Sequence, residues 1–168
     1  MIKYSTARAG QIVAEELERA RQLIINHIRA TGQNASGRTV TSLHVEQKTD
    51  GGVLWGRKPF GTLETGRRPG RVPYRFADII RQWMIDKGVH ATPLPYKTNK
   101  PHKYTPQERS DMSMAHAIAR SIAKRGTRLY RTGGRNDVYS NVIPTTLKRI
   151  ADRFGALIDT QFNTIKLN

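Results

Sequence analysis

The chain has 168 residues, of which 37% are hydrophobic, and this length and composition suit one ordinary domain with a single core. It contains no cysteine, which excludes disulfides, thiolate zinc sites and cysteine nucleophiles together. Its 29 Lys and Arg outnumber 13 Asp and Glu, giving a formal net charge of +16 that favours a polyanionic partner. We expect a soluble, unsecreted protein with no membrane partner, because no apolar run reaches the roughly 18 residues of a membrane span.

Residues 7–31 carry the pattern of an amphipathic helix. Acidic residues gather in its first half, Arg29 lies toward its C-terminal end, and Gly32 follows as a C-cap. Apolar side chains recur at steps of three and four residues, at Val13, Leu17, Ala20, Ile24 and Ile28.

Residues 39–56 change to the alternating period of a strand and predict an antiparallel β-hairpin. Thr41, Leu43 and Val45 alternate with polar residues, and an Asp50-Gly51 turn precedes Val53 and the apolar pair after it. His44 falls on the polar side, so we interpret it as an exposed strand residue.

Residues 74–88 predict a second helix, which ends at Gly88. Its apolar stripe consists of Phe76, Ile79, Ile80, Trp83 and Met84. Trp83 has two interpretations, a nucleobase-stacking residue or a core residue, and its place in the stripe favours the core.

Residues 91–104 combine three prolines with Lys97, Lys100 and Lys103, which predicts an exposed, flexible basic arm. Thr105 and Glu108 then form a capping-box pattern for a helix that ends at Gly126. The stripe of this helix is Met112, Ala115, Ile118, Ala119 and Ile122.

A Gly-rich basic loop at 126–137 leads to a terminal amphipathic helix that begins near Pro144 and contains the weakening residue Gly155. The apolar stripe of this helix is Leu147, Ile150, Ala151, Phe154, Ile158 and Phe162. The predicted fold class is α+β, with residues 1–168 in a single domain. It has a long N-terminal helix, an antiparallel hairpin and two to three further helices packed on it.

The positive charge is unevenly distributed, and residues 112–136 contain no acid. We expect one basic face that contacts DNA, with Arg120, Lys124, Arg125, Arg128, Arg131 and Arg135 as its candidate residues.

Catalytic patterns are scarce. The five histidines lack metal-ligand spacing, and no nucleophile elbow, P-loop or dinucleotide fingerprint occurs. Glu46 and Lys48 raise the alternative of a metal-dependent nuclease, but no aspartate precedes them in the chain. Tyr130 or Tyr139 among arginines raises that of a tyrosine recombinase, for which the chain is short. We therefore expect no enzyme activity, no metal and no cofactor.

The stretch "LETGRRPGRVP" at 63–73 is the most specific part of the sequence. With "GRKPFG" before it, "YRFADIIRQWMIDKG" after it and the later "AHAIARSIAKRGTRLY", it resembles the small tail-completion proteins of long-tailed bacteriophages, also called neck or head–tail connector proteins. The resemblance covers about residues 36–130. It implies a non-catalytic α+β virion protein, assembled in the bacterial host cytoplasm. It further implies a ring, most often a hexamer, between the portal and the tail tube, with neighbouring neck and tail-tube or terminator proteins as partners and packaged DNA nearby.

In this interpretation the 63–73 stretch is a stiffened loop at a subunit or partner interface. Glu64 pairs with an arginine at a subunit boundary, and the arginines face DNA phosphates or acidic groups of a neighbouring ring. The candidate interface residues are Glu64, Gly66, Arg67, Arg68, Pro69, Gly70 and Arg71. Two alternatives stay open: an ordinary solvated loop at this position, and a stand-alone basic nucleic-acid-binding protein as the function.

Overall fold

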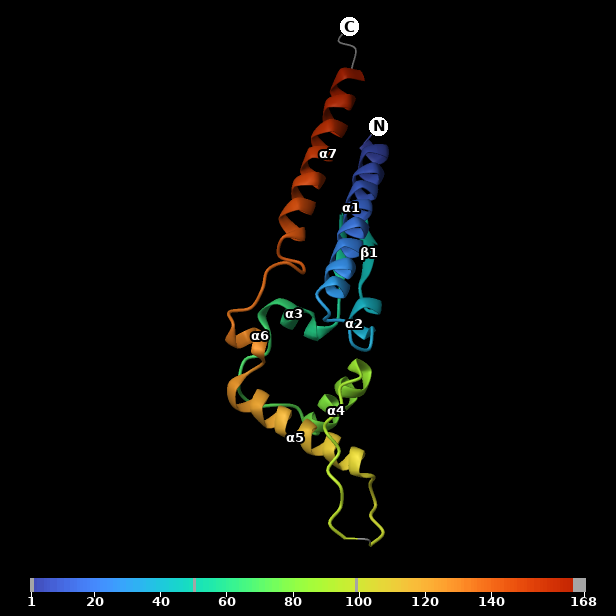
Figure 1. The fold of residues 1–168 in the computed structure, drawn as a ribbon. Coiled ribbons are helices and arrows are strands. Elements are labelled where there is room, and N and C mark those ends of the chain that lie inside the picture. The colour runs from blue at the N-terminus through green and yellow to red at the C-terminus, as the bar shows by residue number, and fades with distance from the viewer. Residues whose placement is uncertain (1, 50, 99, 165–168) are drawn as a thin grey trace. The chain divides into compact units, whose positions relative to one another are not determined.

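The structure is a computed structural model that describes residues 2–49, 51–98 and 100–164 (Figure 1). Its fold class is α+β, as predicted, with helices and one two-stranded antiparallel sheet. The chain, expected as a single domain over residues 1–168, divides into two compact units. We call residues 1–64 with 135–168 the hairpin unit, and residues 65–134 the inserted unit. Each unit has its own cluster of buried apolar side chains, which explains the division.

The hairpin unit begins with α1 (Ile2–Ala30), which confirms the predicted N-terminal helix. Ala20, Ile24 and Ile28 are buried as the stripe predicts, while Val13 and Leu17 are half-buried. Gly32 follows the helix with a φ of 68°, a left-handed conformation that glycine adopts without strain.

The predicted hairpin is present as β1 (His44–Lys48) and β2 (Gly51–Trp55), with Val45 opposite Leu54. His44 is exposed, as expected, and Asp50 of the predicted turn lies outside the described residues. Thr41 belongs to the short helix α2 (Arg38–Thr41) instead of a strand. The hydroxyl of Thr41 donates to the carbonyl of Gly37, so a local turn replaces the extended backbone here.

A 3-10 turn, η1 (Lys58–Gly61), and the short α3 (Thr62–Thr65) follow the hairpin, and α7 (Val142–Thr164) completes the unit. α7 packs along α1, and Arg153 donates to both Glu15 and Glu16 of that helix. The core of the unit gathers side chains from α1, from α2 and the link after it, from the segment before α7 and from the start of α7: Ala20, Ile24, Ile25, Ile28, Val40, Leu43, Val138 and Val142.

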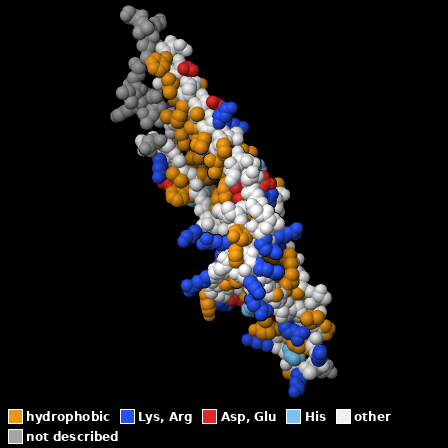
Figure 2. Space-filling model, turned by 90° about the vertical axis from the view of Figure 1, so that its left-hand side faces the viewer, with side chains coloured by type: hydrophobic (Ala, Val, Ile, Leu, Met, Phe, Trp, Pro, Cys, Tyr) orange, Lys and Arg blue, Asp and Glu red, His pale blue; other side chains and the backbone are white. Residues whose placement is uncertain are grey.

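The apolar stripe predicted for the terminal helix lies on α7, as expected, but most of its side chains are exposed. Leu147, Ile158 and Phe162 are 62%, 50% and 68% exposed. The reason is that α1 packs against a single side of α7, and the side chains that point elsewhere stay open to solvent. Figure 2 shows hydrophobic side chains gathered along this part of the molecule.

The inserted unit consists of α4 (Phe76–Lys87), α5 (Pro106–Arg125) and the short α6 (Arg128–Arg131). The predicted Gly88 cap and the Thr105–Glu108 capping box are both present. α4 packs against α5 through a cluster of Ile80, Met84, Ala115 and Ala119.

The α4 stripe is narrower than predicted. Ile79 and Trp83 are 52% and 42% exposed, so the expected core position of Trp83 is wrong in this respect. α5 covers one side of α4, and side chains about 100° away around the helix remain outside the contact.

The predicted arm contains no helix or strand over 91–98 and 100–104. It is nevertheless bonded to α5, because the amide of Ala91 donates to Asp111 at 2.7 Å and that of Leu94 donates to Ser110 at 3.0 Å. Among the residues that the structure describes, no helix is long and apolar enough to cross a membrane.

Candidate functional site

The 63–73 stretch is divided between the two units. Leu63 and Glu64 belong to the hairpin unit, and Thr65 to Pro73 belong to the inserted unit. The contacts of each half are therefore described within its own unit.

Glu64 is an internal hydrogen-bond acceptor of the hairpin unit. The residue is only 3% exposed, and its Oε1 accepts the amides of Val138, Tyr139 and Ser140 at 2.8, 2.6 and 2.9 Å. The Ser140 hydroxyl donates to Oε2, and the amide of Arg135 donates to the Glu64 carbonyl at 2.9 Å. The predicted arginine partner is thus replaced by main-chain amides, which compensate a buried carboxylate inside its own chain.

These hydrogen bonds determine the protonation of Glu64. Burial acts to raise the pKa of this carboxyl group, but the Ser140 hydroxyl and the three amides outweigh burial and hold the pKa below its usual value. The carboxylate therefore stays charged at neutral pH and fastens residues 138–140 to α3.

Two glycines allow the other half of the stretch to approach the start of α6 within the inserted unit. Gly66 has a φ of 67°, and a Cβ there would lie 2.4 Å from the amide nitrogen of Tyr130. Gly126 has a φ of 75°, and its Cβ would lie 2.7 Å from the carbonyl oxygen of Arg67. Both positions exclude a side chain by conformation and by space.

Arg67 lies at the centre of this contact. Its amide donates to the Thr127 hydroxyl at 2.9 Å, and its carbonyl accepts the amide of Thr127 at 2.9 Å. Its guanidinium lies 5.5 Å from the ring centroid of Phe76 and donates to the carbonyl of Arg71 at 2.6 Å. Gly66 and Arg67 thus brace the inserted unit, whether or not they also contact another subunit.

The remaining candidate interface residues lie at the surface. Arg68, Pro69, Gly70 and Arg71 are exposed, and with Arg67 they line a shallow depression of about 510 Å³. The amide of Gly70 donates to the carbonyl of Ala123 at 2.8 Å, which holds this tip against α5. A partner can reach the exposed Arg68 and Arg71.

A larger groove of about 600 Å³ lies between α4, α5 and α6 of the same unit. Arginine and half-exposed aromatic side chains meet apolar ones along it, an arrangement found in binding sites of this size. We call it the arginine groove and define it by Arg67, Phe76, Ile80, Trp83, Ile118, Ile122, Arg128, Leu129 and Arg131, together with Ser121, Gly126 and Thr127.

Most of the predicted DNA-facing residues gather at this unit. Those at the end of α5 and in α6 are all exposed: Arg120, Lys124, Arg125, Arg128 and Arg131. Arg135 instead belongs to the hairpin unit and pairs with Asp137 at 2.5 Å.

The two units differ in charge. The inserted unit contains 15 Lys and Arg against four Asp and Glu, a formal net charge of +11, and the hairpin unit carries the remaining +5. Figure 2 shows Lys and Arg side chains concentrated over α4 to α6 and few over the α1 and α7 part.

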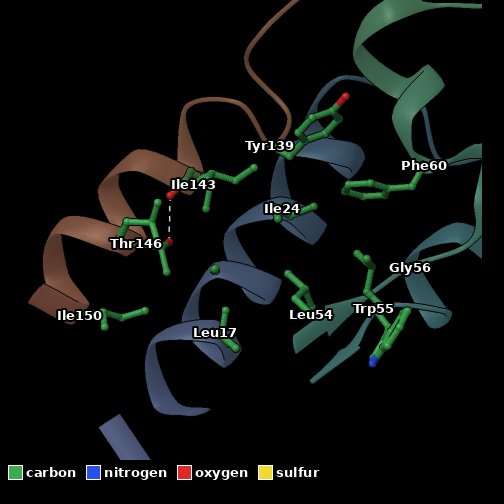
Figure 3. Close-up of a pocket in the computed structure, with 14 residues that line it drawn as sticks. Leu17, Ile24, Leu54, Trp55, Gly56, Phe60, Tyr139, Ile143, Thr146 and Ile150 are labelled. Carbon is green, nitrogen blue, oxygen red and sulfur yellow. Dashed lines mark hydrogen bonds between the residues drawn. The ribbon is translucent and has the colours of Figure 1, made fainter. Parts of the chain in front are cut away.

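The hairpin unit has a pocket of its own, of about 230 Å³ (Figure 3). Its walls are almost entirely apolar, and the hydroxyl of Thr146 is satisfied by the carbonyl of Val142 at 2.8 Å. Its lining comes from α1, β2, η1 and α7 and includes Leu17, Ile24, Leu54, Trp55, Phe60, Ile143 and Ile150. The pocket continues onto the exposed stripe of α7 through Leu147.

The residues considered for catalysis have structural contacts. Glu46 accepts the indole N–H of Trp55 at 2.5 Å across the hairpin. Tyr139 donates its hydroxyl to the carbonyl of Gly61 at 3.2 Å, and burial raises its pKa. Within the described parts of the chain, no three His, Asp or Glu side chains are close enough together to hold a metal ion.

Sequence reasoning missed the arginine groove because Arg67, Trp83 and Arg128 lie on three separate segments. The available signal was the pair of arginine-flanked glycines, Gly66 and Gly126, which mark a close backbone approach. None of the protein-family models, curated proteins and solved structures compared with this chain matches it. The resemblance to phage neck proteins therefore remains a prediction from the residues of the chain.

Proposed function

We propose that this protein is a tail-completion, or neck, component of a long-tailed bacteriophage that assembles into a ring at the head–tail junction. It acts by docking with further copies and with neighbouring neck and tail-tube proteins, and it breaks no bond. Its place is the virion, after assembly in the bacterial host cytoplasm.

The observation that carries this proposal is the exposed apolar surface of the hairpin unit. Leu147, Ile158 and Phe162 are half or more exposed along α7, and the apolar pocket lies beside the first of them. An apolar surface of this kind is typical of a protein contact site. The basic surface of the inserted unit suits a position near packaged DNA.

A double substitution on α7, Leu147→Asp with Phe162→Asp, tests the proposal. Because charged groups at the centre of a packed contact cost several kcal/mol, the wild-type protein is expected to form discrete oligomers and the variant to remain monomeric. Sedimentation velocity of the purified proteins over a range of concentrations measures both.

Ile85→Asp is the matched control, because Ile85 is 55% exposed but lies on α4 of the inserted unit. Circular dichroism verifies that each variant is folded. A wild-type protein that stays monomeric at every concentration contradicts the proposal, and so does a double variant that assembles as the wild type does. In infected cells, the variant is expected to leave heads and tails unjoined in electron micrographs.

The charge of the inserted unit favours a second candidate, a stand-alone basic nucleic-acid-binding protein. Such a protein binds duplex DNA as a monomer or dimer, and its affinity falls steeply as salt rises. A ring component binds DNA weakly by itself and assembles with concentration. Sedimentation with and without duplex DNA separates the two functions.

A further inference from the structure

We propose that the arginine groove of the inserted unit binds single-stranded nucleic acid, with a base stacked on Trp83 and phosphates held by Arg128 and Arg131. This inference does not rest on the proposed ring assembly. It concerns residues of one unit, which lie in α4, α5, α6, the link between α5 and α6, and the 66–71 turn.

Trp83 supplies an aromatic surface that the protein leaves uncovered. It is 42% exposed, although its neighbours Ile80 and Met84 on α4 are buried. Phe76 and Ile122 continue the apolar lining beside it. Every nucleobase has a π-face and stacks on such a surface without regard to sequence.

The arginines along the groove are not neutralised. Arg128 and Arg131 are exposed, and no carboxylate in the described residues forms an ion pair with either of them. Residues 112–134 contain no Asp or Glu at all. A planar guanidinium binds phosphate oxygens with two parallel hydrogen bonds, and it releases condensed counterions when it does so.

The acidic residues of the inserted unit are held elsewhere. Asp78 pairs with Arg75 at 2.5 Å, and Asp86 accepts from Gln82 at 2.9 Å within α4. Glu108 caps α5, and Asp111 accepts from Ala91 and His90. The positive field of the groove is therefore uncompensated along α6, as a polyanionic occupant requires.

The shape of the site is rigid, which lowers the entropic cost of binding. The Arg67 amide donates to the Thr127 hydroxyl, its carbonyl accepts the Thr127 amide, and Gly126 permits the close approach. Stacking on Trp83 requires a base that is free of its partner strand, and duplex DNA keeps its bases inside the helix. The combination of an aromatic lining and unpaired arginines thus favours a single strand.

The fluorescence of Trp83 tests the inference directly. The chain has two tryptophans, so Trp55→Phe leaves Trp83 as the one reporter in the full-length protein. Titration with a short oligothymidylate is expected to quench this fluorescence, and oligouridylate separates DNA from RNA preference. The same sequence as a duplex is expected to quench far less. This titration changes no residue of the groove.

Two groove variants are made in the wild-type background, in which Trp55 is unchanged. Fluorescence anisotropy of labelled oligothymidylate measures their binding affinity. Trp83→Ala is expected to weaken binding about tenfold or more, through the loss of one stacked base. The logarithm of the binding constant falls with the logarithm of the salt concentration, by about 0.7 for each phosphate that a single strand has neutralised. Arg128→Ala with Arg131→Ala removes two such contacts, so the slope is expected to become shallower by about 1.4.

Two matched controls make the same kind of change outside the groove. Arg57→Ala with Lys58→Ala removes two charges from the hairpin unit, and Ile85→Ala shortens an exposed apolar side chain on α4 outside the groove. Both are expected to bind as the wild type does. The inference is overturned if the single strand leaves Trp83 fluorescence unchanged, or if Trp83→Ala binds normally. Quenching by an acidic peptide with no response to oligothymidylate also overturns it and identifies a protein ligand. None of these outcomes depends on whether the protein forms rings.

Discussion

The two units of this protein expose different kinds of surface to solvent. The hairpin unit leaves apolar side chains of α7 open and carries a formal charge of only +5. The inserted unit, with 70 residues, carries +11 and surrounds a half-exposed tryptophan with arginines. The net charge of +16 is therefore the sum of two different surfaces, one suited to apolar contacts and one suited to polyanions.

The units also differ in the contacts that hold distant segments together within each of them. The hairpin unit depends on a buried carboxylate, Glu64, which gathers three amides of a distant segment. The inserted unit depends on the absence of side chains at Gly66 and Gly126, which lets two backbones touch. Each unit contains one tryptophan, Trp55 or Trp83, so denaturation of each is followed separately in single-tryptophan variants.

The largest expected effect is that of Gly66→Ala on the inserted unit. The new Cβ meets the Tyr130 amide nitrogen at 2.4 Å in a left-handed conformation, and clash and strain together cost about 3 kcal/mol of unfolding free energy. Urea denaturation followed by Trp83 fluorescence measures the loss. The transition followed by Trp55 is expected to stay in place if the two units are stabilised separately.

Gly88→Ala is the control for the conformational part of that effect. Gly88 has a φ of 63°, but its Cβ meets no atom within 4 Å, so the expected loss is about 1 kcal/mol. Equal losses in the two variants contradict the close approach at Gly66.

The second effect concerns Glu64→Gln in the hairpin unit. A neutral amide oxygen accepts the three main-chain hydrogen bonds more weakly than a carboxylate, and the NH₂ group that replaces Oε2 cannot accept from the Ser140 hydroxyl. We therefore expect a loss of about 2 kcal/mol. Urea denaturation followed by Trp55 fluorescence at neutral pH is the measurement. Asp159→Asn, an exposed change on α7, is the control and is expected to have little effect.

The same substitution predicts a change in pH dependence. The pKa of Glu64 is lower in the folded state than in the unfolded state. Its contribution is therefore complete above about pH 5, and it is lost as the pH falls through the folded-state pKa. The hairpin unit of the wild type is expected to lose more stability on acidification than that of Glu64→Gln. Urea denaturation at a series of acidic pH values measures this loss for both proteins. An equal loss of stability in the two proteins contradicts the assignment.

The smallest effect is that of Thr105→Ala, which removes the side-chain cap of α5. Loss of such a cap costs about 1 kcal/mol, and it is expected in the Trp83 transition alone. Thr92→Ala, also exposed and in the same unit, is the matched control. A shift of the Trp55 transition as large as that of Trp83 shows that the units unfold together.

The local features of this fold could be predicted from the sequence. The capping box at Thr105, the left-handed Gly88 and the period of α1 are confirmed, because each depends on residues within a few positions of one another. The α+β class follows from the same local signals.

Partners and exposure could not be predicted in this way. Glu64 takes its hydrogen bonds from residues 74 to 76 positions later in the chain, and Gly66 meets Tyr130. The stripes of α4 and α7 were found as helical periods, but the period does not say how much of a stripe a neighbour covers. Trp83 is expected in a core from its place in the stripe and is 42% exposed instead.

The sequence by itself determined where the long helices and the hairpin lie, and that the chain carries a large excess of positive charge. Only the tertiary structure decided that Glu64 is buried among amides, that the backbone at Gly66 lies against Tyr130, and that Trp83 lines a groove together with arginines. The physical reason is distance along the chain. Backbone conformation responds to nearest neighbours, whereas burial and hydrogen-bond partners are fixed by segments that meet only after folding.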